Sequence, residues 1–256
     1  MYRPVFTKQP ESWQEWWSAV RAFTASWYGI PAGEIHGHHP EAAALEQEIG
    51  VTISPSVHEW AAFSADLRQA GIFEQAIRED YTLSWKPDTN ALRLLTISEG
   101  NVEWVVTRQI LGDEDPPVEC LHIDDGAGPV LATWRHTATT SEFALQQLIA
   151  YLRHPGGGFS VDITPSPELV DQLRSIGQTS IRLSRQTLIE DDDLLILIGE
   201  SPWTQPDGWS SIQVEVGPSR INSIPEVLSE LTQGRGGWFT GSFADSILNH
   251  RASADG

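Results

Sequence analysis

The hydrophobic period of this chain changes near Tyr81, and that change constrains the fold more than any other feature. Before Tyr81, apolar residues recur every three or four positions, which places them on one face of a helix. Beyond it, apolar and polar residues alternate, as they do along a half-buried strand. Helices followed by consecutive strands predict an α+β fold with a central antiparallel sheet flanked by helices.

The part of the chain before Tyr81 predicts three helices. Residues 11–28 carry a tryptophan-rich stripe, which could be a binding face but is more often core, and we expect it in the core. Residues 41–49 predict a short helix that ends at Gly50, because glycine readily adopts the left-handed backbone of a helix terminus. Ser54 then caps a third helix, with Pro55 at its first position.

The middle of the chain predicts a series of antiparallel strands, followed by a helix over residues 143–152. Gly100 and Asn101 make one of the expected turns, and Asp124, Asp125 and Gly126 make another. The expected strands are residues 92–96, 102–106, 118–122 and 131–135.

A His-Pro-Gly-Gly-Gly run at residues 154–158 reads as a linker or hinge, because no GK[ST] phosphate-loop ending follows it. We therefore divide the chain into residues 1–155, an N-terminal helix plus the core, and residues 156–256, a β-rich C-terminal extension. Residues 194–198 are apolar throughout and must be covered on both faces, so we expect the extension to pack on the same core. The elements expected in it are helices at 168–176 and 224–232 and strands at 180–190, 194–199 and 212–216.

The charge of the chain limits its partners. With 35 acidic and 16 basic residues, the net charge is -19. Nucleic acid and anionic membrane surfaces both require clustered Lys and Arg, so we expect neither as a partner. An acidic excess serves solubility in some proteins and steers a basic partner in others, and charge alone leaves both interpretations open.

The cysteine content and the N-terminus favour a cytoplasmic protein. Cys120 is the one cysteine, so no intrachain disulfide can form, as is usual in a reducing compartment. The first residues contain no apolar segment of the kind that a secretory signal needs. No run reaches the roughly 18 apolar residues of a membrane helix.

Candidate catalytic and metal-binding residues are sparse. His36, His38 and His39 cluster in one loop, but their spacing matches no standard zinc pattern, so we favour a solvated loop. Cys120 is expected to pack as a small apolar residue, since the sequence names no base beside it. Neither a G-x-S-x-G nor an H-E-x-x-H motif occurs. We therefore expect no catalytic residue, no metal and no cofactor.

Several motifs, in their order and spacing, resemble those of the SUKH superfamily over roughly residues 35 to 155. The resemblance implies a SUKH-like α+β core that binds other proteins without catalysis. That superfamily includes bacterial immunity proteins against polymorphic toxins and fungal regulators of cell-wall assembly. The motifs are Leu45-Glu46-x-Glu48-Ile49-Gly50-Val51-x-Ile53-Ser54-Pro55-Ser56-Val57-x-Glu59-Trp60, Asn101-x-x-Trp104, Asp115-Pro116-Pro117-Val118 and Ser141-Glu142-Phe143-x-Leu145-x-x-Leu148.

The resemblance and the charge together favour an immunity protein that binds and neutralises a cognate toxin, and the acidic charge would suit a basic toxin. The alternative is a scaffold or regulatory protein with an endogenous, non-toxic partner. Acidic turn residues are candidates for contacting a basic partner, although a solvated turn is the simpler interpretation for each. They are Asp113, Glu114, Asp115, Asp124, Asp125, Asp191, Asp192 and Asp193. The sequence leaves the partner and the oligomeric state open.

Overall fold

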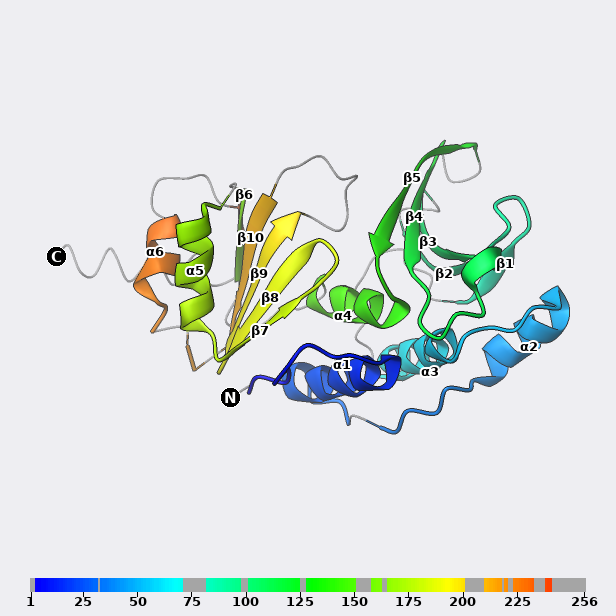
Figure 1. Ribbon diagram of the computed structural model, residues 1–256, viewed down its shortest axis with the longest axis horizontal. Coiled ribbons are helices and arrows are strands. Elements are labelled where there is room, and N and C mark those ends of the chain that lie inside the picture. Colours follow the sequence, from blue (N-terminus) through cyan, green and yellow to red (C-terminus); the bar gives the residue numbers. More distant parts are fainter. Residues whose placement is uncertain are drawn as a thin grey trace. The chain divides into compact units, whose positions relative to one another are not determined.

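The structure, a computed structural model, describes residues 3–31, 33–70, 82–97, 101–124, 128–150, 158–162, 165–200, 210–217, 219–220, 223–232 and 238–240 (Figure 1). The chain divides into two compact units, named here for their sheets. The five-stranded unit comprises Glu11–Ala25 and Ile30–Gln147, and the six-stranded unit comprises Met1–Pro10, Ser26–Gly29 and Leu148–Gly256.

The helices of the first half begin and end where local sequence directs them. Gly50 ends α2 with a left-handed φ of 62°, and its N–H bonds to the carbonyl of Glu46. The Ser54 hydroxyl accepts a hydrogen bond from the N–H of Val57 at 3.1 Å, which caps α3 as expected. The helices are α1 (Trp13–Tyr28), α2 (Pro40–Ile49), α3 (Pro55–Gln69) and α4 (Thr140–Ala150).

The five-stranded sheet is an antiparallel meander in the order β1-β2-β3-β4-β5, so β1 and β5 form its edges within the described residues. Each strand pairs with the next one along the chain, as short connections favour. A single 3₁₀ turn, η2 (Arg108–Ile110), follows β3. The strands are β1 (Ser84–Lys86), β2 (Ala91–Ile97), β3 (Val102–Thr107), β4 (Val118–Ile123) and β5 (Val130–Thr137).

Aromatic rings join the layers of the five-stranded unit. Trp17 of α1 meets Phe63 of α3 edge-on, with ring centroids 5.6 Å apart. Trp60 of α3 contacts Phe143 of α4 at 5.1 Å, and Phe143 in turn lies 6.2 Å from Trp104 on β3. Most of the tryptophan stripe belongs to the core, as expected: Trp16, Trp17, Val20 and Phe23 are buried, while Trp13 is half-buried.

The six-stranded sheet has the order β11-β6-β10-β9-β8-β7 and is antiparallel throughout. Figure 1 shows α5 and α6 on one face of this sheet, where Leu173 and Leu228 join the apolar side chains of β8, β9 and β10 in one buried cluster. The strands are β6 (Gly158–Asp162), β7 (Thr179–Arg182), β8 (Gln186–Asp191), β9 (Leu194–Glu200), β10 (Ser210–Val216) and β11 (Trp238–Thr240), and the helices are α5 (Pro167–Ile176) and α6 (Glu226–Thr232).

The expected α+β class is confirmed, and the strand prediction needs one correction. The single strand expected at residues 180–190 is wrong, because the chain turns at residues 183–185 and forms β7 and β8. The N–H of Leu183 bonds to the carbonyl of Gln186 at 2.8 Å and closes this turn. Strands β1, β6 and β11 were not expected from the sequence. Among the described helices, none has the length and apolar character that a membrane crossing requires.

The expected boundary at residue 155 lies close to the division at Gln147 and Leu148. The division differs from the expected one because it places residues 1–10 and 26–29 with the six-stranded unit. The turn at Gly100 and the linker at 154–157 lie outside the described residues. Residues 194–198 are buried throughout, as expected. Packing of the C-terminal part on the first core stays a prediction.

Two buried glutamates lie on the sheet face opposite the cluster that contains Leu173. Leu195 of β9 lies opposite Glu190 of β8 and Glu215 of β10, so the three side chains share one face. The Glu190 carboxylate accepts hydrogen bonds from the N–H groups of Val5 at 2.9 Å and Phe6 at 3.0 Å. Burial raises the pKa of Glu190 to about 7 and that of Glu215 to about 7, although hydrogen bonds to both carboxylates oppose the shift.

These raised pKa values predict that stability falls as the pH rises from about 4.5 to about 7, because the folded chain holds protons that the unfolded chain releases. Glutamine cannot ionise and still accepts hydrogen bonds from the backbone. We expect the double variant Glu190→Gln, Glu215→Gln to lose most of this slope, to which each glutamate contributes at most about 1.4 kcal/mol per pH unit. The measurement is the midpoint of urea unfolding, monitored by circular dichroism at several pH values across this range.

The control for this experiment is Glu168→Gln on α5. Hydrogen bonds from its own N–H and from Ser166 lower the pKa of the exposed Glu168, so its shift is opposite in direction to that of the two buried glutamates and cannot make stability fall as the pH rises. The control should keep the slope of the wild-type protein. An unchanged slope in the double variant would show that neither buried carboxyl titrates between pH 4.5 and 7.

Candidate functional site

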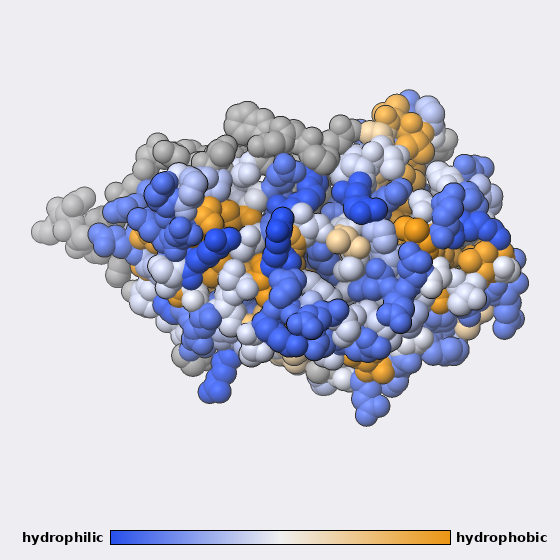
Figure 2. Space-filling view, in the orientation of Figure 1, coloured by the Kyte–Doolittle hydropathy of each residue, from blue (hydrophilic) through white to orange (hydrophobic). Residues whose placement is uncertain are grey.

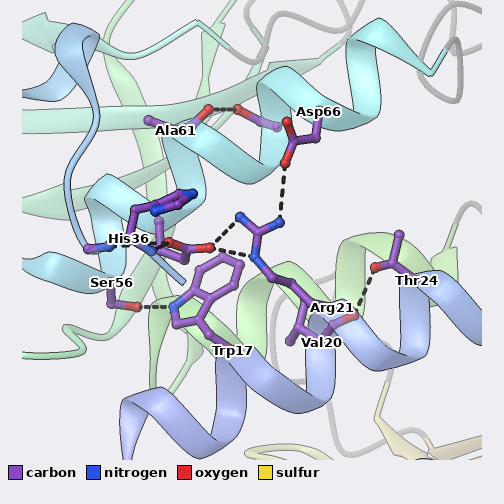
Figure 3. A network of polar contacts seen from close by, with 11 residues as sticks. Trp17, Val20, Arg21, Thr24, His36, Ser56, Ala61 and Asp66 are labelled. Carbon is purple, nitrogen blue, oxygen red and sulfur yellow. Dashed lines mark hydrogen bonds and ion pairs between the residues drawn. The ribbon is translucent and has the colours of Figure 1, made fainter. Parts of the chain in front are cut away.

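A buried ion pair connects α1 to α3 within the five-stranded unit. Arg21 donates from Nε to Glu59 Oε1 at 2.6 Å, and a second guanidinium nitrogen pairs with the same oxygen. The two side chains are 5% and 0% exposed. The guanidinium also reaches Asp66 at 3.2 Å, as Figure 3 shows. Because an unpaired buried charge is very costly, this geometry fixes how α1 lies against α3.

The same glutamate holds the histidine-containing loop. Its second oxygen, Oε2, accepts hydrogen bonds from the N–H of His36 at 3.0 Å and of Gly37 at 3.4 Å. These bonds use the backbone, and the side chains of His36 and His38 are exposed. The expectation of a solvated loop is therefore confirmed for these two side chains, while the backbone beneath them is fixed.

The third histidine contacts a fourth one on α3. The N–H of His39 donates to Nδ1 of His58 at 3.0 Å, and the ring of His38 stacks on His58 at 5.4 Å. Nε2 of His58 lies 3.6 Å from Glu46. Within the described ranges, no three His, Cys, Asp or Glu side chains are arranged to hold a metal ion.

Asp115 joins three segments of the five-stranded unit. Its Oδ1 accepts a hydrogen bond from the Ser56 hydroxyl at 2.6 Å, and that hydroxyl in turn accepts one from the indole of Trp17 at 2.7 Å. Its carboxylate also binds the N–H of Ser141 at 3.1 Å and the hydroxyl of the same residue. Burial raises the pKa of Asp115, and these hydrogen bonds oppose the rise. This carboxylate therefore ties the Asp-Pro-Pro-Val turn to the first turns of α3 and α4.

The other acidic residues expected in this unit lie on its surface. Asp113 and Glu114 are exposed beside Asp115 in one turn, and Asp124 is exposed at the end of β4. Asp125 lies outside the described residues. The turn before β4 thus presents two acidic side chains to solvent and holds the third, the half-buried Asp115, by hydrogen bonds.

The three consecutive aspartates lie at the β8–β9 hairpin of the six-stranded unit, as expected. The side chain of Asp191 pairs with Arg220 and accepts a hydrogen bond from Gln178 at 2.9 Å. Asp193, with a left-handed φ of 53°, accepts hydrogen bonds from the N–H and hydroxyl of Ser219. Both aspartates are buried and organise the loop after β10, which leaves the half-buried Asp192 as the accessible member.

Cys120 lies at the centre of β4 and is fully buried. Its cross-strand neighbours are Trp104 on β3 and Trp134 on β5. A thiol enclosed by two indoles fills core volume, as the sequence predicts.

The β4–β5 hairpin carries a surface that the sequence analysis missed. Val130 and Leu131 are 41% and 56% exposed, the large apolar side chains most open to solvent among the described residues. Figure 2 shows apolar atoms gathered at the end of this hairpin, at the upper right of the view. Both residues belong to β5, which is an edge strand. Alternation alone predicted the strand and gave no signal for its place in the sheet.

The chain was compared with family models, curated proteins and solved structures. No family model, no curated protein and no solved structure matches the chain. The case for a function therefore depends on the arrangement of its own side chains.

Mutation can test whether Asp115 stabilises the fold more than its exposed neighbour Asp113. Asp115→Ala leaves three buried hydrogen-bond donors without their acceptor, so we expect it to lower the free energy of unfolding by about 2–3 kcal/mol. The matched control, Asp113→Ala, should change it by less than about 0.5 kcal/mol, because this side chain is exposed. Chemical denaturation followed by tryptophan fluorescence measures both. Equal losses for the two variants would contradict the bridging role of Asp115.

Proposed function

We propose that this protein is a non-catalytic immunity protein of the cytoplasm that binds and neutralises a cognate toxin. The motif resemblance supports the class, and the single observation that carries the proposal is the β5 edge with its exposed Val130 and Leu131. Two adjacent exposed apolar side chains on an open strand edge form the kind of surface that pairs with another chain.

Strand β5 is suited to pairing with another chain. It is eight residues long, and within the described residues it pairs with β4 alone. An open edge presents N–H and C=O groups that a strand of a partner can bind. The exposed side chains of Thr133 and Arg135 continue along the same strand beyond the apolar end. The edge therefore combines an apolar anchor with a polar stretch.

The acidic residue beside the apolar end of this edge favours a basic partner there, while the exposed Arg135 lies further along β5. Asp124 is exposed, and its N–H bonds to the carbonyl of Pro129 at 3.1 Å, which brings it next to the exposed Val130. Affinity in protein complexes comes mainly from buried apolar anchors, while surrounding charges steer the encounter and speed association. An acidic residue beside an apolar patch, in a chain of net charge -19, fits a toxin with a basic surface.

Leu131→Asp tests this surface directly. A charge placed in the apolar patch should weaken binding of the cognate toxin by at least about thirtyfold, because truncation of a central anchor typically costs about 2 kcal/mol or more. It should also abolish protection when both proteins are expressed together. The residue is already exposed, so folding should be unaffected. The matched control is Glu48→Lys, an exposed residue on α2. Unchanged affinity for Leu131→Asp would reject β5 as the contact.

The steering role of the acidic residues has its own measurement. The triple variant Asp113→Asn, Glu114→Gln, Asp124→Asn should associate more slowly with the toxin. The dependence of its association rate on salt should fall, while the dissociation rate should change little. Surface plasmon resonance at several salt concentrations separates the two rates. If association and its salt dependence are unchanged, these acidic residues serve solubility.

The alternative, a scaffold or regulatory protein, would use the same edge for an endogenous partner. Deletion of the gene distinguishes the two functions. Sensitivity of the deletion strain to a toxin that the wild-type strain resists supports immunity, whereas a growth or envelope defect without that sensitivity supports a regulatory role.

A further inference from the structure

The six-stranded unit has a pocket of about 370 Å³ at one end of its sheet, which none of the functions above uses. Pockets of this size hold small metabolites or a single charged group of a larger ligand. It is formed by the β7–β8 turn, the last residues of β9 and the first residue of β10. The lining residues are Arg182, Leu183, Ser184, Arg185, Gln186, Thr187, Ile198, Gly199, Glu200 and Ser210.

The wall of this pocket is preformed. The N–H of Glu200 bonds to the carbonyl of Arg185 at 3.1 Å, which joins the end of β9 to the β7–β8 turn. Gly199 has a φ of 143°, and a Cβ there would lie 2.3 Å from the same carbonyl oxygen. Glycine is thus required for the close approach of the two segments. A pocket held by backbone contacts loses little entropy when a ligand binds.

The two arginines of the pocket, Arg182 and Arg185, differ in exposure and in whether a carboxylate pairs with them. The Arg185 side chain is 9% exposed, and its Nε and Nη2 bind Glu200 Oε2 at 3.1 and 2.9 Å. That guanidinium is therefore fixed and neutralised. Arg182 is exposed, and in the described part of the chain no carboxylate pairs with its guanidinium. Its backbone is nevertheless held, because Gln9 bonds to its N–H at 2.8 Å and to its carbonyl at 3.0 Å.

We propose that this pocket binds a compact anionic group, a carboxylate or a phosphate, through the guanidinium of Arg182. The planar fork of arginine matches both groups with two parallel hydrogen bonds. Thr187 and Ser210 line the same pocket, and their hydroxyl groups can act as further donors. The fixed pair of Arg185 and Glu200 adds no net charge, so the pocket has a net positive charge within a chain of net charge -19.

Titration of the full chain with two probes tests this site. Inorganic phosphate represents a free phosphorylated metabolite, and a blocked aspartyl peptide represents an acidic side chain of a protein. Amide NMR shifts are followed at constant ionic strength, held with chloride. We expect saturable shifts confined to residues 182–187 and 198–200 with at least one of the probes. The probe that saturates identifies the source of the anion.

Three variants make the result specific. Arg182→Gln should weaken binding at least tenfold, and Arg182→Lys should recover only part of it, because lysine keeps the charge and loses the fork. Arg174→Gln, on α5, removes another exposed arginine of the same unit and should leave binding unchanged. Shifts that never saturate, that scatter over other basic residues, or that persist in Arg182→Gln would mean an adventitious ion only and would overturn the proposal.

Discussion

The five-stranded unit depends on the burial of one carboxylate, that of Glu59. A fully buried charge is tolerated only if its partners surround it, and the partners of Glu59 come from α1 and from the loop at residues 36–37. The helix and the loop are separate in the sequence, yet both must be in place before the Glu59 carboxylate has its ion pair and its hydrogen bonds. The same requirement acts on Arg21, which is just as deeply buried and has its own second contact at Asp66. The position of α1 thus follows from electrostatics as well as from the apolar stripe.

Local signals predicted the elements well, because period, caps and turn residues act over a few positions. Ser54 and Pro55 begin α3, and Gly50 ends α2, as expected from these residue types alone. The missed turn between β7 and β8 has no glycine or proline, so the apolar alternation seemed continuous through it. Of the three missed strands, β1 and β11 are edge strands of three residues, too short to show a period. Strand β6 begins at Gly158, inside the glycine run that was expected to be a linker.

The candidate site was harder to predict, because exposure depends on partners that are distant in sequence. Each acidic residue in a turn has the same local pattern, and a solvated turn is the simplest expectation for all of them. Asp115 finds Ser141 26 positions later, and Asp191 finds Arg220 29 positions later. No spacing rule connects such pairs. The exposed Leu131 poses the same difficulty, since alternation identifies a strand and says nothing about whether the strand lies at an edge.

The hydrogen bonds of the half-buried Asp115 also determine how its acidic neighbours are held. The hydrogen bonds of Asp115 to α3 and α4 hold the turn in which Asp113 and Glu114 are exposed. Charges on a fixed backbone keep a constant potential toward a partner, and less freedom is lost when they bind than on a mobile loop. In the proposed immunity function, the carboxylate of Asp115 therefore contributes to recognition by holding this turn. The division of an acidic run into an internal and an external part is what allows a turn to be both stable and strongly charged.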